Sequence, residues 1–176
     1  YGDYDADGVS SSAILMTALK KIGAKNLSIY IPDRNKEGHG LKSEAIKELA
    51  NQKIQLIITL DCGITNIKEI KLANSLGDEV IIVDHHRCLK NLPAAKVIVN
   101  PHQPGDKYPF KNLAAAGVAF KLAQALLRSI ERDVSKNTFK IVSEKWFLDL
   151  RGKSHSRFYR LEKNPTCPSN GPGPWQ

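Results

Sequence analysis

Apolar residues along this chain of 176 residues follow two different spacings. Near-continuous apolar runs, rich in β-branched residues, cover residues 54–60 and 80–83 and are typical of strands buried on both faces of a sheet. Shorter runs at residues 27–31 and 96–99 predict two further strands. Residues 32–40 predict a loop.

A second spacing, with apolar residues three or four positions apart, predicts helices between the strands. The predicted helices cover residues 9–22, 43–49, 113–130 and 134–150, with one more between residues 65 and 77. We expect Ser43 to cap the helix that begins there, and Thr65 or Asn66 to cap the next one. Gly23 and Gly77 are expected to end helices, since glycine readily adopts the left-handed conformation found there.

Strands that alternate with helices at this spacing predict an α/β fold, with a parallel β-sheet flanked by helices on both faces. In such sheets ligands bind beyond the carboxyl ends of the strands. The chemistry of this protein is therefore expected in the segments that directly follow each strand.

Acidic and imidazole side chains follow three predicted strands, including a first strand of which the sequence holds only the end. The residues concerned are Asp3, Asp5 and Asp7 in "YGDYDADG", Asp61 in "DCG", and Asp84, His85 and His86 in "DHH". Because the carboxyl ends of parallel strands share one edge of a sheet, these groups are expected to converge.

Carboxylates that crowd into one pocket must share protons or bind cations. An oxygen-rich set with one or two imidazoles favours Mn²⁺ or Mg²⁺, whereas zinc more often brings cysteine or more histidine. Two such ions would form a phosphoryl-transfer centre. Taken singly, each signal has another interpretation: the aspartate-rich segment is a turn or a calcium loop, Asp61 is a helix cap, and the histidine pair is structural.

Composition narrows the class of protein. Hydrophobic residues make up 41% of the chain, which excludes a disordered protein, and no apolar run reaches the roughly 20 residues that cross a bilayer. Three cysteines, Cys62, Cys88 and Cys167, lack zinc spacing and predict reduced thiols in a cytoplasmic protein. The net charge of +8 fits a polyanionic partner or simply a solvated basic surface.

Three short motifs resemble those of a known enzyme family. "GDYDADG", "LDCG" and "VDHH" are similar to motifs I, II and III of the DHH phosphoesterases. The segments "IPDRNKEGHGL", "VNPHQPGDKYPF" and "AAAGVAFKLAQALL" are similar to the RecJ-like branch of that family, the exonucleases specific for single-stranded DNA. The resemblance runs over residues 1–150 and implies the DHH-domain fold.

The resemblance implies a set of metal ligands and a substrate. Asp5 would bind one Mn²⁺ or Mg²⁺ ion and Asp7 the other, with Asp61 bridging them. His85 would bind the second ion, and Asp3 would replace a histidine found in other branches. The implied activity is 5′–3′ hydrolysis of phosphodiester bonds in single-stranded DNA, in repair and recombination, with a single-strand-binding protein or a helicase as partners.

Further roles follow from the same resemblance. His86 would contact the scissile phosphate or protonate the leaving oxygen, and Asp84 would orient a histidine. Arg34 and His39 would reach the nucleic-acid backbone, although the family more often has tyrosine where His39 lies. Asn100 would support the phosphate site or simply begin a turn.

The end of the chain departs from the family pattern. The family's fourth motif, similar to "ALGTVAD", is expected after "KWFLDL" at residues 145–150, but residues 151–176 lack it and read as disordered or out of frame. We therefore expect a DHH domain at residues 1–150, truncated at its N-terminus, without the C-terminal DHHA1-type domain and with reduced activity. Two alternatives stay open: a phosphodiesterase for short oligonucleotides or small phosphodiesters, and a non-catalytic nucleic-acid-binding fragment.

Overall fold

The computed structural model describes residues 1–131. The elements are α1 (Ala6–Lys21), α2 (Ser43–Asn51), β1 (Leu56–Leu60), α3 (Ile67–Leu76), β2 (Glu79–Val83), β3 (Val97–Val99) and α4 (Ala115–Glu131). The predicted helix at residues 134–150, Cys167 and the segment 151–176 lie outside the described residues.

The three strands form a parallel sheet in the order β1-β2-β3. Ile58 pairs with Ile81, and Ile82 pairs with Ile98. Tyr1 and Gly2 run parallel to β1 on its other side, since the Leu60 amide donates to the Tyr1 carbonyl at 2.9 Å. The predicted parallel α/β fold is confirmed.

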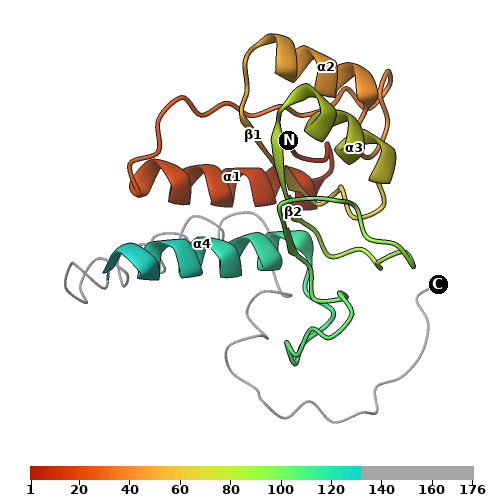
Figure 1. Cartoon of the computed structure of the whole chain (residues 1–176). Coiled ribbons are helices and arrows are strands. Elements are labelled where there is room, and N and C mark those ends of the chain that lie inside the picture. The colour runs from red at the N-terminus through yellow and green to blue at the C-terminus, as the bar shows by residue number, and fades with distance from the viewer. Residues whose placement is uncertain (132–176) are drawn as a thin grey trace. The chain divides into compact units, whose positions relative to one another are not determined.

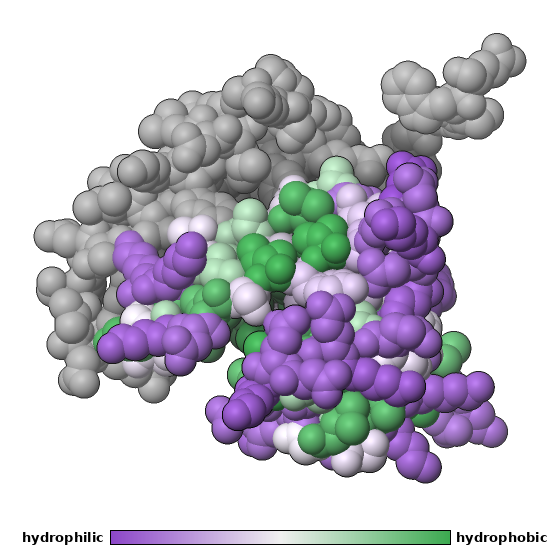
Figure 2. Space-filling model, turned by 90° about the horizontal axis from the view of Figure 1, so that it is seen from above, coloured by the Kyte–Doolittle hydropathy of each residue, from purple (hydrophilic) through white to green (hydrophobic). Residues whose placement is uncertain are grey.

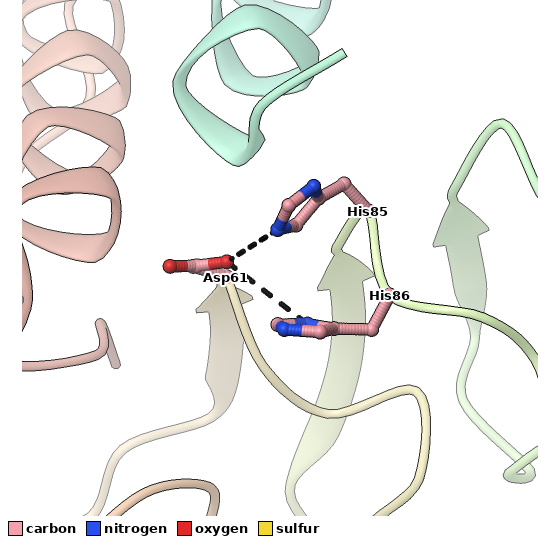
Figure 3. Close-up of side chains that lie close together, drawn as sticks. All are labelled: Asp61, His85 and His86. Carbon is pink, nitrogen blue, oxygen red and sulfur yellow. Dashed lines mark ion pairs between the residues drawn. The ribbon is translucent and has the colours of Figure 1, made fainter. Parts of the chain in front are cut away.

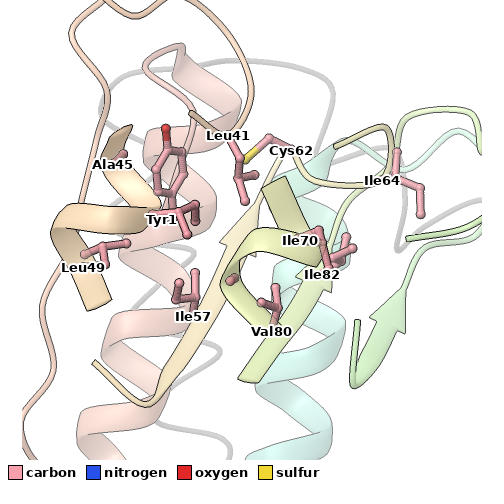
Figure 4. Packing of buried hydrophobic residues seen from close by; sticks show 12 residues of the cluster. Tyr1, Leu41, Ala45, Leu49, Ile57, Cys62, Ile64, Ile70, Val80 and Ile82 are labelled. Carbon is pink, nitrogen blue, oxygen red and sulfur yellow. The ribbon is translucent and has the colours of Figure 1, made fainter. Parts of the chain in front are cut away.

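Helices cover both faces of this sheet (Figure 1). On one face α2 and α3 pack together, and on the other α1 and α4 lie side by side. The side chains of Ile57, Val80 and Ile82 point toward α2 and α3 and form a buried cluster with Ile46 and Ile70 (Figure 4). Because side chains alternate along a strand, Leu60 and Val83 lie on the face toward α1 and α4, where they are also buried.

Three local predictions were wrong or displaced. Residues 27–31 form no strand, although the Tyr30 carbonyl accepts one bond, from the Gly2 amide. Ser43 is the first residue of α2 rather than its cap; Lys42 occupies the cap position and makes no side-chain cap bond. Helix α1 begins three residues earlier than predicted, because the Asp5 side chain caps it.

One face of the described part is largely polar. Figure 2 shows hydrophilic residues over much of the visible face, with hydrophobic residues in smaller groups. Within residues 1–131, no helix is both long enough and apolar enough to span a membrane.

Candidate metal centre

The predicted site residues come together at the carboxyl edge of the sheet. Asp61 directly follows β1, and Asp84, His85 and His86 directly follow β2. Figure 3 shows the side chains of Asp61, His85 and His86 pointing toward one another from these two strand ends. The segment from Asp3 to Asp7 follows Tyr1 and Gly2, which extend the sheet beside β1.

Asp61, His85 and His86 form the tightest group of potential metal ligands in the described part. One ligand atom from each lies within 4.8 Å of the others. Oδ1 of Asp61 lies 3.2 Å from Nε2 of His85 and 4.0 Å from Nδ1 of His86. One carboxylate and two imidazoles at this spacing match the donor types that Mn²⁺ accepts in proteins.

The Asp61 carboxylate is buried and poorly satisfied. Its residue is 3% exposed, and Oδ1 has no hydrogen-bond partner among the described residues despite the nearby His85 ring. Burial raises the pKa of Asp61; the contact with His85 opposes this, while the charges of Asp7 and Asp5 add to it. A buried, unpartnered carboxylate oxygen is costly, and a cation beside it would remove that cost.

Nε2 of His85 faces Asp61, and the contact with that carboxylate raises the pKa of His85. Its Nδ1 lies 3.0 Å from the Leu113 carbonyl, which can only accept, so Nδ1 carries the hydrogen and Nε2 does not in the neutral ring. Nε2 faces Asp61 at 3.2 Å and Oδ2 of Asp7 at 3.8 Å. A histidine whose second nitrogen is held by a carbonyl is the usual form of a metal ligand.

Asp84 holds His86. Its buried Oδ1 accepts from Nδ1 of His86 at 2.7 Å and from the His85 amide at 2.7 Å, and Oδ2 accepts from the Ile64 amide at 3.0 Å. Burial alone would raise the pKa of Asp84, but the bonds from His86 and from backbone amides hold it below its ordinary value. The Asp84 bond in turn raises the pKa of His86 to about 9, against the effect of burial.

Replacing Asp84 with Asn should lower the pKa of His86 from about 9 toward the ordinary histidine value. The raised pKa also means that protonated His86 stabilises the fold below about pH 6.5 and that this contribution disappears as the pH rises through about 9. The measurement is an NMR titration of the histidine rings in the metal-free protein. An Asp106→Asn variant, whose carboxylate pairs with Lys111, is the control and should leave the His86 titration unchanged.

Asp5 and Asp7 hold helix ends in addition to facing the site. Oδ1 of Asp5 accepts from the amides of Asp7 and Gly8, both at 2.9 Å, and so caps α1. Asp7 accepts from the Ala115 and Ala116 amides at 2.7 and 2.8 Å, at the start of α4. The clustering of these carboxylates, predicted from metal binding alone, therefore has a structural cause as well.

The first turn of α1 requires glycine where it packs against Asp3. A Cβ atom on Gly8 would lie 2.5 Å from the carbonyl oxygen of Asp3 and 2.6 Å from its nitrogen. These backbone atoms cannot move without displacing the segment that carries Asp5 and Asp7. Gly8 is thus part of what positions both carboxylates.

Asp3 connects the site to the loop after residue 31. Its residue is 5% exposed, Oδ1 accepts from the Tyr4 amide at 2.6 Å, and Oδ2 lies 2.9 Å from Nδ1 of His39. The His39 ring packs against the Tyr4 ring at 4.3 Å between centroids, and the Arg34 guanidinium lies over the Tyr4 ring, 5.5 Å from its centroid. Arg34 and His39, predicted as substrate-binding residues, are therefore brought together, but through Tyr4, which sequence reasoning missed.

Asn100 lies behind the site. It is 2% exposed; its Nδ2 donates to the His86 carbonyl at 2.9 Å and its Oδ1 accepts from the His102 amide at 2.7 Å. Both ends of the side chain thus bind backbone. In the structure Asn100 ties the segment after β3 to the "DHH" segment, as well as leading into the turn at Pro101.

The predictions from the sequence did not include two features of the site. The Leu113 carbonyl that orients His85 is 28 residues away from it, and any residue could supply a carbonyl. Tyr4 lies inside the acidic motif and could have been noted as the one aromatic residue between Asp3 and Asp5.

Comparison with known proteins places these motifs in a family. The model of the DHH family, N-terminal domain, matches residues 1–144. The chain belongs to the DHH family. The matched region includes "YGDYDADG", "LDCG" and "VDHH", the segments at the carboxyl edge of the sheet in this DHH chain.

Curated relatives of this DHH chain include RecJ proteins. The chain is 51% identical over 127 residues to the single-stranded-DNA-specific exonuclease RecJ of Bacillus subtilis (strain 168), and 41% identical over 132 residues to that of Escherichia coli (strain K12). These alignments cover 72% and 75% of this chain but only 16% and 23% of the relatives, so the chain spans under a quarter of their length.

The fold is likewise similar to solved RecJ structures. One is an exonuclease RecJ bound to manganese, which is 39% identical in sequence and superposes with a TM-score of 0.65. The match covers 73% of this chain and 32% of that RecJ chain. Another, RecJ in complex with Mn²⁺ from Thermus thermophilus, shares 37% identity with a TM-score of 0.59 over 73% of this chain and 18% of the other.

Proposed function

We propose that this DHH chain carries the metal-binding part of a nuclease that hydrolyses phosphodiester bonds in single-stranded DNA. The observation that carries the proposal is the buried Oδ1 of Asp61, which lacks a hydrogen-bond partner among the described residues and lies 3.2 Å from Nε2 of His85. The similarity to RecJ exonucleases supports single-stranded DNA as the substrate. We extend the proposal to 5′–3′ digestion in repair and recombination, in the cytoplasm, with a single-strand-binding protein or a helicase as partners.

The aspartates and His85 would hold two Mn²⁺ or Mg²⁺ ions. Asp61 and His85 would hold one with Asp7, and Asp5 would reach the other, with Asp61 shared and Asp3 as a further ligand. When bound, such ions lower the pKa of a water molecule and stabilise charge on phosphate oxygens. The charges of Asp5 and Asp7, which raise the pKa of Asp61, mark a site built to receive positive charge.

His86 is suited to act as a general acid. In the metal-free chain its pKa of about 9 keeps it protonated at neutral pH, and its Nδ1 is committed to Asp84 at 2.7 Å. The remaining Nε2–H is therefore the proton that it would deliver to the leaving oxygen of the cleaved strand. Asp84 orients the ring and preserves its charge.

Arg34, Tyr4 and His39 are suited to bind the strand. They form a continuous group in which Tyr4 contacts the other two, next to Asp3 at the carboxyl edge. Single-stranded nucleic acids are bound by cations that contact phosphates and by aromatic rings that contact bases. We assign the phosphate contact to Arg34 and a positioning role to Tyr4.

Replacing Arg34 with Ala should weaken binding of a single-stranded oligonucleotide. It should also reduce the slope of log K against the logarithm of the salt concentration by about one, as expected for the loss of one phosphate contact. Fluorescence anisotropy over a range of salt concentrations measures both. Lys36→Ala is the matched control, because Lys36 is on the same loop with a side chain that is 82% exposed. An equal change in salt dependence in both variants would contradict a specific contact by Arg34.

A hydrolysis assay tests the proposed function. The chain is incubated with Mn²⁺ or Mg²⁺ and with a long single-stranded oligonucleotide labelled at its 5′ end, or with a dinucleotide. Release of mononucleotides from the 5′ end of the long strand supports the proposal, whereas cleavage of the dinucleotide alone favours a phosphodiesterase for small substrates. Binding of the long strand without cleavage, at metal concentrations that saturate the site, would identify a non-catalytic binding protein.

A further inference from the structure

Strand β1 runs into an unusual turn at the site. Asp61 has a φ of +64°, a left-handed conformation that residues with a side chain rarely adopt, and Gly63 has a φ of +110°. The Asp61 amide still donates to the Val83 carbonyl at 3.0 Å, so the β1–β2 pairing continues to the ligand itself. The carboxylate thus leaves the sheet from a backbone fixed in a disfavoured conformation.

Thr59 holds the inside of this turn. The residue is fully buried, and its hydroxyl donates to the Cys62 carbonyl at 2.8 Å, three residues along the chain. A Cβ atom on Gly63 would lie only 2.6 Å from this hydroxyl oxygen and 3.4 Å from two carbons of Ile82. The turn is therefore packed directly onto the Thr59 hydroxyl.

Four bonds fix the segment from Asp61 to Ile64. The Asp61 amide donates to the Val83 carbonyl, and the Ile64 amide donates to Oδ2 of Asp84 at 3.0 Å. The Gly63 carbonyl accepts from the Asn66 amide at 3.0 Å, and the Cys62 carbonyl accepts from the Thr59 hydroxyl. A left-handed conformation at a residue with a side chain persists only where the surroundings over-determine it. Without the hydroxyl, the buried Cys62 carbonyl loses its donor and the turn can relax.

We propose that Thr59 is a positioning residue for Asp61: its hydroxyl bond to the Cys62 carbonyl keeps Asp61 in the left-handed conformation that aims the carboxylate at His85. The proposal rests on the proposed function in so far as Asp61 binds a metal ion. Thr59 itself contacts neither metal nor substrate, and it acts through the backbone of the turn.

The test compares Thr59→Val with Thr59→Ser. Valine keeps the shape and removes the hydroxyl, whereas serine keeps the hydroxyl and removes the methyl group. Titration calorimetry with Mn²⁺ should show that Thr59→Val binds at least about tenfold more weakly than the unmodified chain. This is the range found when groups that orient a metal ligand are lost. Thr59→Ser should bind Mn²⁺ within about threefold of the unmodified chain. Equal affinity in Thr59→Val and the unmodified chain, or a Thr59→Ser variant as weak as Thr59→Val, would overturn the proposal.

Hydrogen exchange separates this proposal from the proposed function, because it needs no metal. In Thr59→Val, the Asp61 amide should lose at least about tenfold of its protection relative to the Ile82 amide in β2, and Thr59→Ser should restore it. A loss spread evenly over Asp61 and β2 would indicate general destabilisation and overturn the positioning role. If the unmodified chain binds no Mn²⁺ but the exchange result holds, the metal-binding function fails and the role of Thr59 in the turn stands.

A milder variant keeps the test decisive if Thr59→Val does not fold. Cysteine is close in size to serine, and its thiol is only a weak hydrogen-bond donor. Thr59→Cys should therefore bind Mn²⁺ several-fold more weakly than Thr59→Ser. Equal affinities and equal Asp61 exchange in these two folded variants would overturn the proposal.

Discussion

Replacing Asp61 with Asn is expected to weaken Mn²⁺ binding by at least about 100-fold while raising the thermal stability of the metal-free chain. Loss of a group that merely orients a ligand costs roughly 10–100-fold in affinity, and Asp61 is proposed to be a shared ligand. Asn has the same shape but no charge, and amide oxygens bind Mn²⁺ less strongly than carboxylates. Titration calorimetry measures the first effect, and thermal unfolding in the presence of a chelator measures the second.

The opposite sign of the two effects follows from the pKa of Asp61. Burial and the nearby charges of Asp7 and Asp5 raise it in the folded chain, despite the contact with His85. A carboxyl group whose pKa is raised by folding destabilises the fold above its ordinary pKa, since the unfolded chain ionises more easily. A neutral side chain removes this cost at neutral pH. A variant with lower stability and unchanged Mn²⁺ affinity would show that Asp61 is a structural carboxylate.

Asp78 provides a matched control. Like Asp61 it is a buried aspartate, 5% exposed, with a carboxylate oxygen, Oδ2, that lacks a hydrogen-bond partner among the described residues. Its pKa is also raised by burial. It precedes β2 and so lies at the amino edge of the sheet, opposite the site. Asp78→Asn should therefore share the gain in stability and leave Mn²⁺ binding unchanged.

Long apolar runs made the sheet predictable. The runs at residues 54–60 and 80–83 gave β1 and β2 within two residues, because a strand buried on both faces leaves little room for polar side chains. The run at residues 27–31 has a serine beside its centre and leaves Ile29 48% exposed. It forms no strand, and Tyr30 makes a single backbone bond, with the Gly2 amide.

The site was predictable in its location and less so in its internal bonds. The order of motifs along parallel strands placed Asp61 and His85 at one edge, and the structure brings them within 3.2 Å. The partners of these residues depend on tertiary contacts: Leu113 orients His85, and the first turn of α4 binds Asp7 across 108 residues of sequence. Such contacts use backbone groups that every residue carries, so residue type gives no sign of them.

Replacing Asp7 with Asn is expected to destabilise the metal-free chain by about 2–3 kcal/mol, because Asp7 bonds two amides with both carboxylate oxygens. Its Oδ2 and Oδ1 accept from Ala115 and Ala116 at 2.7 and 2.8 Å, where α4 begins beside α1. In Asn one oxygen becomes an NH₂ group that meets an N–H donor, so one bond is lost and two donors face each other. The negative charge that favours a helix start is lost as well.

Urea unfolding in the presence of a chelator measures this effect without any contribution from metal. Glu44→Gln is the matched control, because Glu44 lies exposed in the first turn of α2 and that helix has no side-chain cap bond. It should change stability by less than about 0.5 kcal/mol, through the helix dipole alone. Equal changes in Asp7→Asn and Glu44→Gln would mean that the two amide bonds to α4 contribute nothing beyond the charge.

The two aspartates therefore separate two roles within one cluster. Asp61→Asn should weaken Mn²⁺ binding and raise the stability of the metal-free chain. Asp7→Asn should lower both the Mn²⁺ affinity and the stability, since Asp7 lies 3.8 Å from His85 and also binds the start of α4. Metal bound at Asp7 would thus be coupled to the packing of α4 against α1. Saturating Mn²⁺ should accordingly slow hydrogen exchange of the Ala115 and Ala116 amides in the unmodified chain, and exchange that is unaffected by Mn²⁺ would show that the two roles are independent.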